Sequence, residues 1–298
     1  MAGTWKDFDG LNKLSGVNKV IGEVLLKNEL GGVSNGYEIV HAAAGNASDT
    51  NSGYSFGGNQ LDLANNSHAR DVLKDILINS GTITDGKAFY DSIASKILIK
   101  GDTMALSTDE INTINTALQS TYGKNKLNQD FANEVKDTAE HVQTIIDKII
   151  ADPNTPQGVK DALKTDEMKI FLADYHNQFR LDDNGKMMKF LLGQDVSGLN
   201  GTTINVGTDL TNSDLKTFMQ NTKEYSDNPR GVNNRFDRTE QTIEDNASLL
   251  NKSNKSTTSS HGNSHVADQL NVSKVSSADN AALDSVKDEL ESAVGPGS

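Results

Sequence analysis

Residues 29–63 of this 298-residue chain read ELGGVSNGYEIVHAAAGNASDTNSGYSFGGNQLDL. Glycines, aromatic residues, amides and carboxylates are concentrated here, and the stretch has no helical periodicity. Tyr37 and Ile39 alternate with their neighbours in the manner of a strand, and residues 53–58 alternate in the same way. A segment rich in Gly, Asn, Ser and Asp separates the two runs, as in a turn. The stretch therefore predicts a small hairpin or a three-stranded sheet.

A helix is predicted immediately before this stretch. Ser15 is suited to be its N-cap, and apolar residues follow at helical spacing. The glycines Gly31 and Gly32 end the helix, so Glu29 lies at or just past its C-terminal end. The apolar face consists of Val17, Val20, Ile21, Val24 and Leu25.

Most of the chain after this stretch has the pattern of amphipathic helices. Ser107 and Glu110 have the spacing of a capping box. A long helix is predicted over Leu127–Ile150, and Pro153 and Pro156 end it. The predicted fold is therefore α+β and mostly α, with the small sheet near the N-terminus. Further helical patterns span residues 67–80, 85–100, 107–119, 165–180, 187–192, 211–225 and 234–251.

The composition of the chain changes after Asn251. The segment KSNKSTTSSHGNSH that follows is polar, lacks periodicity and reads as a flexible linker. A short helix is expected later, in ADNAALDSVKDELESA. These features predict one domain over residues 1–251 and a flexible tail over residues 252–298.

Composition also excludes several classes of function. The net charge of −13 and the pI of about 4.9 argue against nucleic acid as the main partner, because phosphate binding needs clustered Lys and Arg. The absence of cysteine removes thiolate metal sites and cysteine nucleophiles. The six histidines lack HExxH spacing, so neither a metal site nor a cofactor is predicted. The segment LDDNGK begins like an EF-hand loop, but Leu191 stands where the bidentate glutamate is required, which favours a plain turn.

The sequence also bears on localisation. No apolar stretch approaches the roughly 20 residues of a spanning helix, so membrane insertion is not predicted. The N-terminal MAGTWKDFDGLNKL lacks the basic start and the apolar run of a secretory signal. We expect the chain to be made in the cytoplasm without a signal peptide. If it acts outside that cell, another route must deliver it.

Four carboxylates in or near the opening stretch are candidate catalytic groups. Glycosidic cleavage needs one carboxyl as a general acid and a second as nucleophile or base, about 5 Å or about 6.5–9.5 Å away. A helix end packed against a hairpin can supply such separations and desolvate one of the two. A pair of carboxylates found by spacing alone is more often structural or idle. The candidates are Glu29, Glu38, Asp62 and Asp49.

Side chains around these carboxylates are suited to bind a sugar polymer. The aromatic rings can stack on sugar faces, the amides can bind hydroxyls, and the glycines would let a polymer approach the backbone. His41 can position a water molecule, although a packed and hydrogen-bonded histidine is the commoner case. The predicted substrate-binding residues are Tyr37, His41, Tyr54, Ser55, Phe56, Asn59 and Gln60.

The order helix, terminal glutamate, GYSFGGNQLDL-type strand and further helices resembles the lysozyme superfamily. SGYSFGGNQLDL and the later DYHNQFRLDDNGKMMKFL are most similar to lysozyme-like domains of bacterial antibacterial effectors and phage-type muramidases. The resemblance implies cleavage of the β-1,4 glycosidic bonds of peptidoglycan without a cofactor, and it assigns the catalytic acid to Glu29. The segment after Glu29 is longer than in compact phage lysozymes, which leaves Glu38 open as the acid.

The resemblance also implies partners. A lysozyme-like effector is delivered by a secretion system or a phage particle to the periplasm or wall of a target bacterium, and an immunity protein protects the producer. Such delivery would offset the repulsion between an acidic chain and an acidic envelope. The alternatives are a lytic transglycosylase, a chitosanase, and a non-enzymatic helical interaction protein or virion component.

Overall fold

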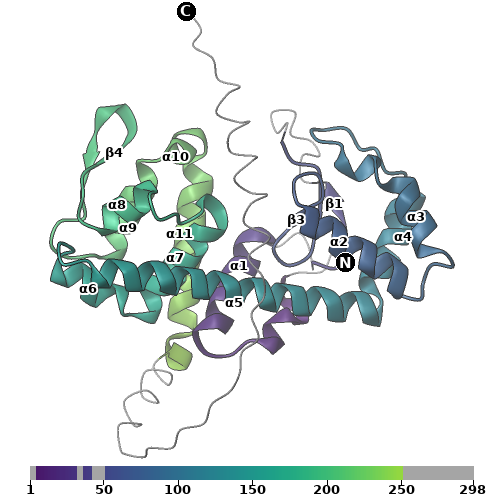
Figure 1. Cartoon of the computed structure of the whole chain (residues 1–298), viewed down its shortest axis with the longest axis horizontal. Helices are drawn as coiled ribbons and strands as arrows, with labels where there is room; N and C mark the ends of the chain where they lie inside the picture. The colour runs from purple at the N-terminus through teal and green to yellow at the C-terminus, as the bar shows by residue number, and fades with distance from the viewer. Residues whose placement is uncertain (1–4, 32–35, 42–50, 251–298) are drawn as a thin grey trace, which may run out of the picture. The chain divides into compact units, whose positions relative to one another are not determined.

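The computed structural model describes residues 5–31, 36–41 and 51–250 (Figure 1). The described chain is mostly helical and contains a three-stranded antiparallel sheet, which confirms the predicted fold class. The helices are α1 (Gly16–Glu29), α2 (Ser67–Asn79), α3 (Gly86–Ile93), α4 (Thr108–Gln119), α5 (Thr121–Ala151), α6 (Gln157–Leu163), α7 (Asp166–Phe179), α8 (Lys186–Leu191), α9 (Asn212–Gln220), α10 (Lys223–Asp227) and α11 (Pro229–Asp245). The strands are β1 (Val40–His41), β2 (Tyr54–Phe56), β3 (Leu61–Asp62), β4 (Val196–Ser197) and β5 (Thr203–Ile204). Short 3₁₀ turns are η1 (Trp5–Asp7), η2 (Asp9–Lys13), η3 (Lys96–Leu98) and η4 (Leu199–Gly201).

Helix α1 forms where its apolar spacing predicts it. Ser15 is the N-cap residue with an extended backbone, and the helix ends at Glu29. Gly31 has φ +55°, a conformation that glycine adopts without strain, so the chain turns away directly after the helix. The buried face of α1 comprises Val20, Ile21, Gly22, Val24, Leu25 and Leu26.

The sheet has the order β1-β2-β3 and is antiparallel throughout. Val40 pairs with Ser55, and Ser55 pairs in turn with Asp62. The β2–β3 connection is the turn GGNQ, in which Gly57 has φ +80°. Gly58 packs against α5, because a Cβ atom there would lie 2.7 Å from the ring of Phe131. Packing against the core therefore accounts for this glycine, in place of the predicted approach of a polymer to the backbone.

Helix α5 is the central element of the described structure. It spans 31 residues and contacts α1, α2, α4, α6, α7 and α8 (Figure 1). It begins six residues before the predicted start, because the Ser120 side chain caps it by accepting a hydrogen bond from the Gly123 amide. Full burial of a large apolar side chain contributes about 1.5–3 kcal/mol. The large apolar residues that α5 buries are Leu127, Phe131, Val135, Val142, Ile145, Ile146 and Ile149.

Other local predictions have mixed outcomes. The capping box at Ser107 and Glu110 is confirmed at the start of α4. The helix predicted over 85–100 is shorter, since α3 ends at Ile93 and η3 follows it. The β4–β5 hairpin was not predicted, because each of its strands has only two residues. The predicted tail over residues 252–298, with its short helix, lies outside the described residues.

Among the described residues, no helix is both long enough and apolar enough to cross a membrane.

Candidate active site

A polar cleft of about 660 Å³ opens between three parts of the fold. The GGNQ turn with β3 forms one wall, the middle of α5 forms the floor, and the C-terminal end of α7 with the residues after it forms the other wall. Amides, carboxylates and imidazoles dominate its surface. The lining residues are Asn59, Gln60, Leu61, Asp62, Asn66, Glu134, Asp137, Thr138, His141, His176, Asn177, Arg180 and Asp182.

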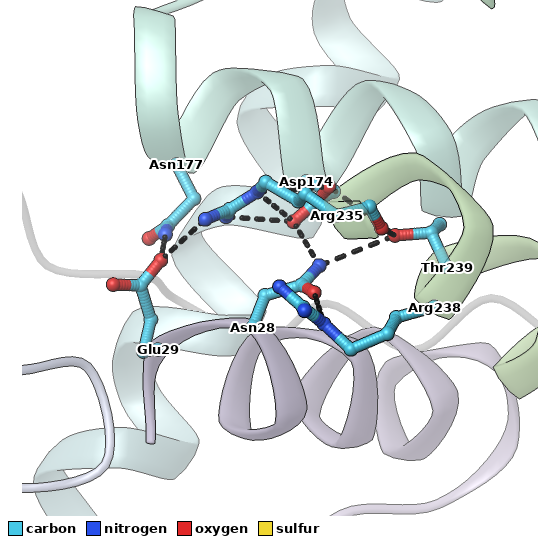
Figure 2. Close-up of polar contacts among 7 residues, drawn as sticks. All are labelled: Asn28, Glu29, Asp174, Asn177, Arg235, Arg238 and Thr239. Carbon is cyan, nitrogen blue, oxygen red and sulfur yellow. Dashed lines mark hydrogen bonds and ion pairs between the residues drawn. The ribbon is translucent and has the colours of Figure 1, made fainter. Parts of the chain in front are cut away.

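Glu29 is not among the residues that line this cleft, but it is hydrogen-bonded to Asn177, which does line it. The Asn177 side-chain amide donates to Glu29 Oε1 at 2.9 Å, and Arg235 Nη1 donates to the same oxygen at 2.9 Å (Figure 2). The Glu29 side chain is 22% exposed. No hydrogen bond to Glu29 Oε2 occurs in the described parts of the chain. One carboxylate oxygen is thus fixed by two donors, whereas the other has no hydrogen-bond partner among the described residues.

Arg235 links Glu29 to a second carboxylate, Asp174. Arg235 Nη2 donates to Asp174 Oδ1 at 2.7 Å, and Arg235 Nε lies 3.0 Å from the same atom. Asn28 Nδ2 and Thr239 Oγ1 also donate to Asp174, at 3.0 and 3.3 Å (Figure 2). Both Arg235 and Asp174 are buried. The network therefore joins α1, α7 and α11.

The charges in this network account for the raised pKa of Arg235. Burial alone would lower its pKa, but the charges of Asp174 and Glu29 and their hydrogen bonds outweigh burial and raise it. Arg235 thus holds two carboxylates at once, Asp174 through Nε and Nη2 and Glu29 through Nη1.

Glu134 is the other distinctive carboxyl of the cleft. Burial raises its pKa to about 7, even though a short hydrogen bond from the Asn59 amide acts in the opposite direction. The charge of Asp130, one helical turn earlier on α5, raises it further. Glu134 has no salt bridge with a lysine or arginine in the described part of the chain. It is therefore a carboxyl whose charged form is poorly compensated.

Two histidines pack against each other at the α7 wall of the cleft. The rings of His141 and His176 lie 4.3 Å apart, and both bond to the backbone of Leu181. The Leu181 amide donates to His176 Nδ1 at 3.0 Å, so this nitrogen must be unprotonated. Burial, followed by the proximity of His141, lowers the pKa of His176 to about 4. His176 is thus neutral at pH 7.

Acid should destabilise the protein through this histidine. The pKa of His176 is lower in the folded chain than its usual 6.5, so the stabilisation is present above pH 6.5 and is lost as the pH falls towards 4. His176→Asn keeps an acceptor for the Leu181 amide but cannot titrate. We expect its free energy of unfolding, measured by urea denaturation, to change less between pH 7 and pH 4.5 than that of the wild type. At pH 8 the two proteins should be similarly stable. Parallel profiles would contradict the prediction.

The structure brings part of the predicted site together. Asn59, Gln60 and Asp62 line the cleft, and Glu29 borders it through Asn177. Asp62 also stabilises its own turn, because it accepts hydrogen bonds from the Ala64 amide and the Asn65 side chain.

Glu38 and Asp49 are not brought to this cleft by any described contact. Glu38 was predicted on the first strand, but it lies before β1 and accepts a hydrogen bond from Gln119 at the end of α4. Glu38 is not among the residues that line the cleft. Asp49 lies outside the described residues.

The predicted aromatic platform belongs to the core instead. The exposed fractions of Tyr37, Tyr54 and Phe56 are 2%, 1% and 0%, so their rings cannot stack on a sugar in this structure. The Tyr37 hydroxyl donates to Asn128 at 2.6 Å, and the Leu106 amide donates to the Tyr54 hydroxyl at 2.9 Å. These rings carry large apolar surfaces, so their burial in the core is more favourable than their exposure to a ligand.

The remaining predicted binding residues also lie away from the cleft lining. Ser55, at the centre of β2, is 3% exposed. The ring of His41 packs edge-on against Tyr54 at 4.6 Å, and neither of its nitrogens has a hydrogen-bond partner within residues 5–31, 36–41 and 51–250. The expected packing of His41 is therefore present, and the expected hydrogen bond is not found in that part of the chain.

Sequence reasoning missed the cleft residues Glu134, His141 and Asn177, and also Arg235, which binds Glu29. Glu134 and His141 lie on an ordinary amphipathic helix, where nothing in the local pattern distinguishes them from solvated positions. Asn177 belongs to the DYHNQF segment, which was singled out as part of a family resemblance but was given no role. Arg235 is one of five arginines in the chain, and that scarcity was the only available signal.

Comparisons with known proteins do not assign the chain to a family. No protein-family model matches the sequence, and neither a curated protein nor a solved structure matches it significantly.

Proposed function

We propose that this protein cleaves the β-1,4 glycosidic bonds of peptidoglycan, with Glu29 as the proton donor. The observation that carries the proposal is the placement of Glu29. It ends α1, it is oriented by Arg235 and Asn177, and it borders an open polar cleft. Polymer-cleaving glycosidases need a carboxyl of this kind at the edge of a groove that is open to a chain.

The chemistry follows from the two oxygens of Glu29. Oε1 is occupied by its two donors, so a transferable proton would be carried on Oε2. That proton passes to the glycosidic oxygen as its bond to the sugar carbon breaks. Water then adds a hydroxyl to that carbon and gives its remaining proton to a carboxylate of the site. Glu29 then becomes charged, and the nearby guanidinium of Arg235 stabilises the charge that develops. Asp62, across the cleft, is proposed as the second carboxylate.

The polar lining suits a glycan. Asn59, Gln60, Asn66 and Asn177 place amides on both walls, where they can exchange hydrogen bonds with hydroxyl and acetamido groups. We place the substrate in the wall of a target bacterium, reached through a secretion system or a phage particle, with an immunity protein as inhibitor. These parts of the proposal rest on the sequence resemblance alone.

The test is a digest of purified peptidoglycan with the full chain. We expect loss of turbidity and soluble muropeptides whose new ends, measured by mass spectrometry, are reducing sugars. Anhydro ends would mean that the same bond is cleaved with the same acid, but that a hydroxyl of the sugar itself attacks in place of water, as in a lytic transglycosylase. A parallel digest of chitosan separates the chitosanase alternative. Release of no fragment from either polymer would overturn the proposal in favour of a non-enzymatic interaction protein.

A further inference from the structure

His68, Asp130 and Glu134 converge on one point beside the cleft. His68 is in the first turn of α2, and Asp130 and Glu134 are one helical turn apart on α5. His68 Nε2 lies 2.8 Å from Asp130 Oδ1. One nitrogen or oxygen atom from each of the three side chains lies within 4.8 Å of the other two. The three ligand atoms are thus assembled by packing between two helices.

A separate observation concerns the surroundings of Glu134. Its carboxyl is half-buried and has no lysine or arginine partner among the described residues, although the Asn59 amide donates to it. The amide of Asn59 that donates to Glu134 has a buried Oδ1 atom with no hydrogen-bond partner among the described residues. A buried amide oxygen without a partner is unfavourable. A cation bound by Glu134 would balance the charge of its carboxylate.

We infer that His68, Asp130 and Glu134 bind one divalent transition-metal ion, with Zn²⁺ as the preferred occupant. One imidazole nitrogen with two carboxylate oxygens is a ligand set that suits Zn²⁺, whereas Ca²⁺ and Mg²⁺ prefer oxygen ligands alone. Zinc bonds of about 2.0–2.2 Å place ligand atoms roughly 3–4 Å apart, close to the spacing already present. Asn59 would remain as a hydrogen-bond partner of Glu134, orienting it.

The sequence shows no local metal-binding motif because the proposed ligands come from two different helices. His68 and Asp130 are 62 residues apart in the sequence, so no spacing rule of the HExxH type applies, and the prediction of no metal site rested on such rules. The proposed ion would tie the GGNQ turn, through Asn59, to α2 and α5. It does not rest on the proposed glycosidase activity, because Glu29 and Asp62 are not ligands.

The test is isothermal titration of the metal-free, tag-free full chain with ZnCl₂. We expect one equivalent to bind saturably and to raise the midpoint of thermal unfolding, since a ligand that binds the folded state stabilises it. His68→Asn and Glu134→Gln should each weaken Zn²⁺ binding at least about tenfold. A loss of that size follows even when the residue removed only hydrogen-bonds to a metal ligand, whereas these two residues are proposed as ligands themselves. Mn²⁺ should bind more weakly than Zn²⁺, and Ca²⁺ should show no saturable binding.

The matched control is His141→Asn, which removes another imidazole of the same cleft. It should leave the affinity for Zn²⁺ unchanged. Circular dichroism of each metal-free variant checks that it is folded. The side chain of His68 is 54% exposed, and substitutions at exposed positions usually change stability little. Absence of saturable binding by the wild type would overturn the inference. So would binding that His68→Asn and Glu134→Gln leave unaltered, or that His141→Asn abolishes.

Discussion

Replacing Glu29 by glutamine should lower the rate of peptidoglycan cleavage by about 10²–10⁴-fold, the usual contribution of a positioned general acid. The glutamine amide cannot transfer a proton. Its side-chain oxygen can still accept the hydrogen bonds from Asn177 and Arg235, so the variant should fold. The rate is measured as muropeptides released per enzyme per minute, beside the circular dichroism spectrum and the thermal midpoint.

Two further variants make this result specific. Glu23→Gln changes a glutamate on the same helix, where Glu23 pairs with Lys27 instead of bordering the cleft, and should keep wild-type activity. Glu38→Gln tests the other candidate acid, whose carboxylate bonds Gln119. Full activity of Glu29→Gln would exclude Glu29 as the acid, and selective loss in Glu38→Gln would transfer the role to Glu38.

Replacing Arg235 by methionine should lower the free energy of unfolding by about 3–5 kcal/mol, the cost of removing one partner from a buried ion pair. Asp174 would keep its bonds from Asn28 and Thr239 but would be left as a buried charge without a cation. The measurement is urea denaturation at pH 7, with the unfolding slope compared to check that both proteins unfold in the same way.

Arg238→Ala is the matched control, since Arg238 is one turn further along α11. Arg238 is exposed and donates to Asn28 Oδ1 at 2.8 Å, so its loss should cost about 1 kcal/mol. Adding Asp174→Leu to Arg235→Met should recover much of the lost stability, because it removes the uncompensated charge. Equal losses in Arg235→Met and Arg238→Ala, or no recovery in the double variant, would contradict this account.

Several elements were predictable because their causes are local. The N-cap at Ser15, the capping box at Ser107 and the helical spacing of apolar residues act within a few positions of one another. The three-stranded sheet was predictable because turn-forming residues separate its strands. Placing Glu29 at the end of a helix followed from the same local rules.

The positions of the aromatic residues in and next to the sheet were harder to predict. Tyr37, Tyr54 and Phe56 have the same local pattern whether their rings face a ligand or the core. Only the packing of Phe8, Leu26 and Phe131 against the GGNQ turn decides between the two, as the tight surroundings of Gly58 show. Strand alternation specifies two faces but does not say what covers each of them.

The sequence by itself determined a mostly helical chain with a small sheet, a glutamate at the end of the first helix, and an acidic surface without thiol chemistry. Tertiary structure alone decided what surrounds that glutamate. Arg235, 206 residues further along, reaches Glu29, and Asn59 covers Glu134 from 75 residues away. Desolvation and ion pairing depend on distance in space, and local sequence rules extend over only a few residues. The chemistry of the cleft therefore arises from contacts that no local pattern encodes.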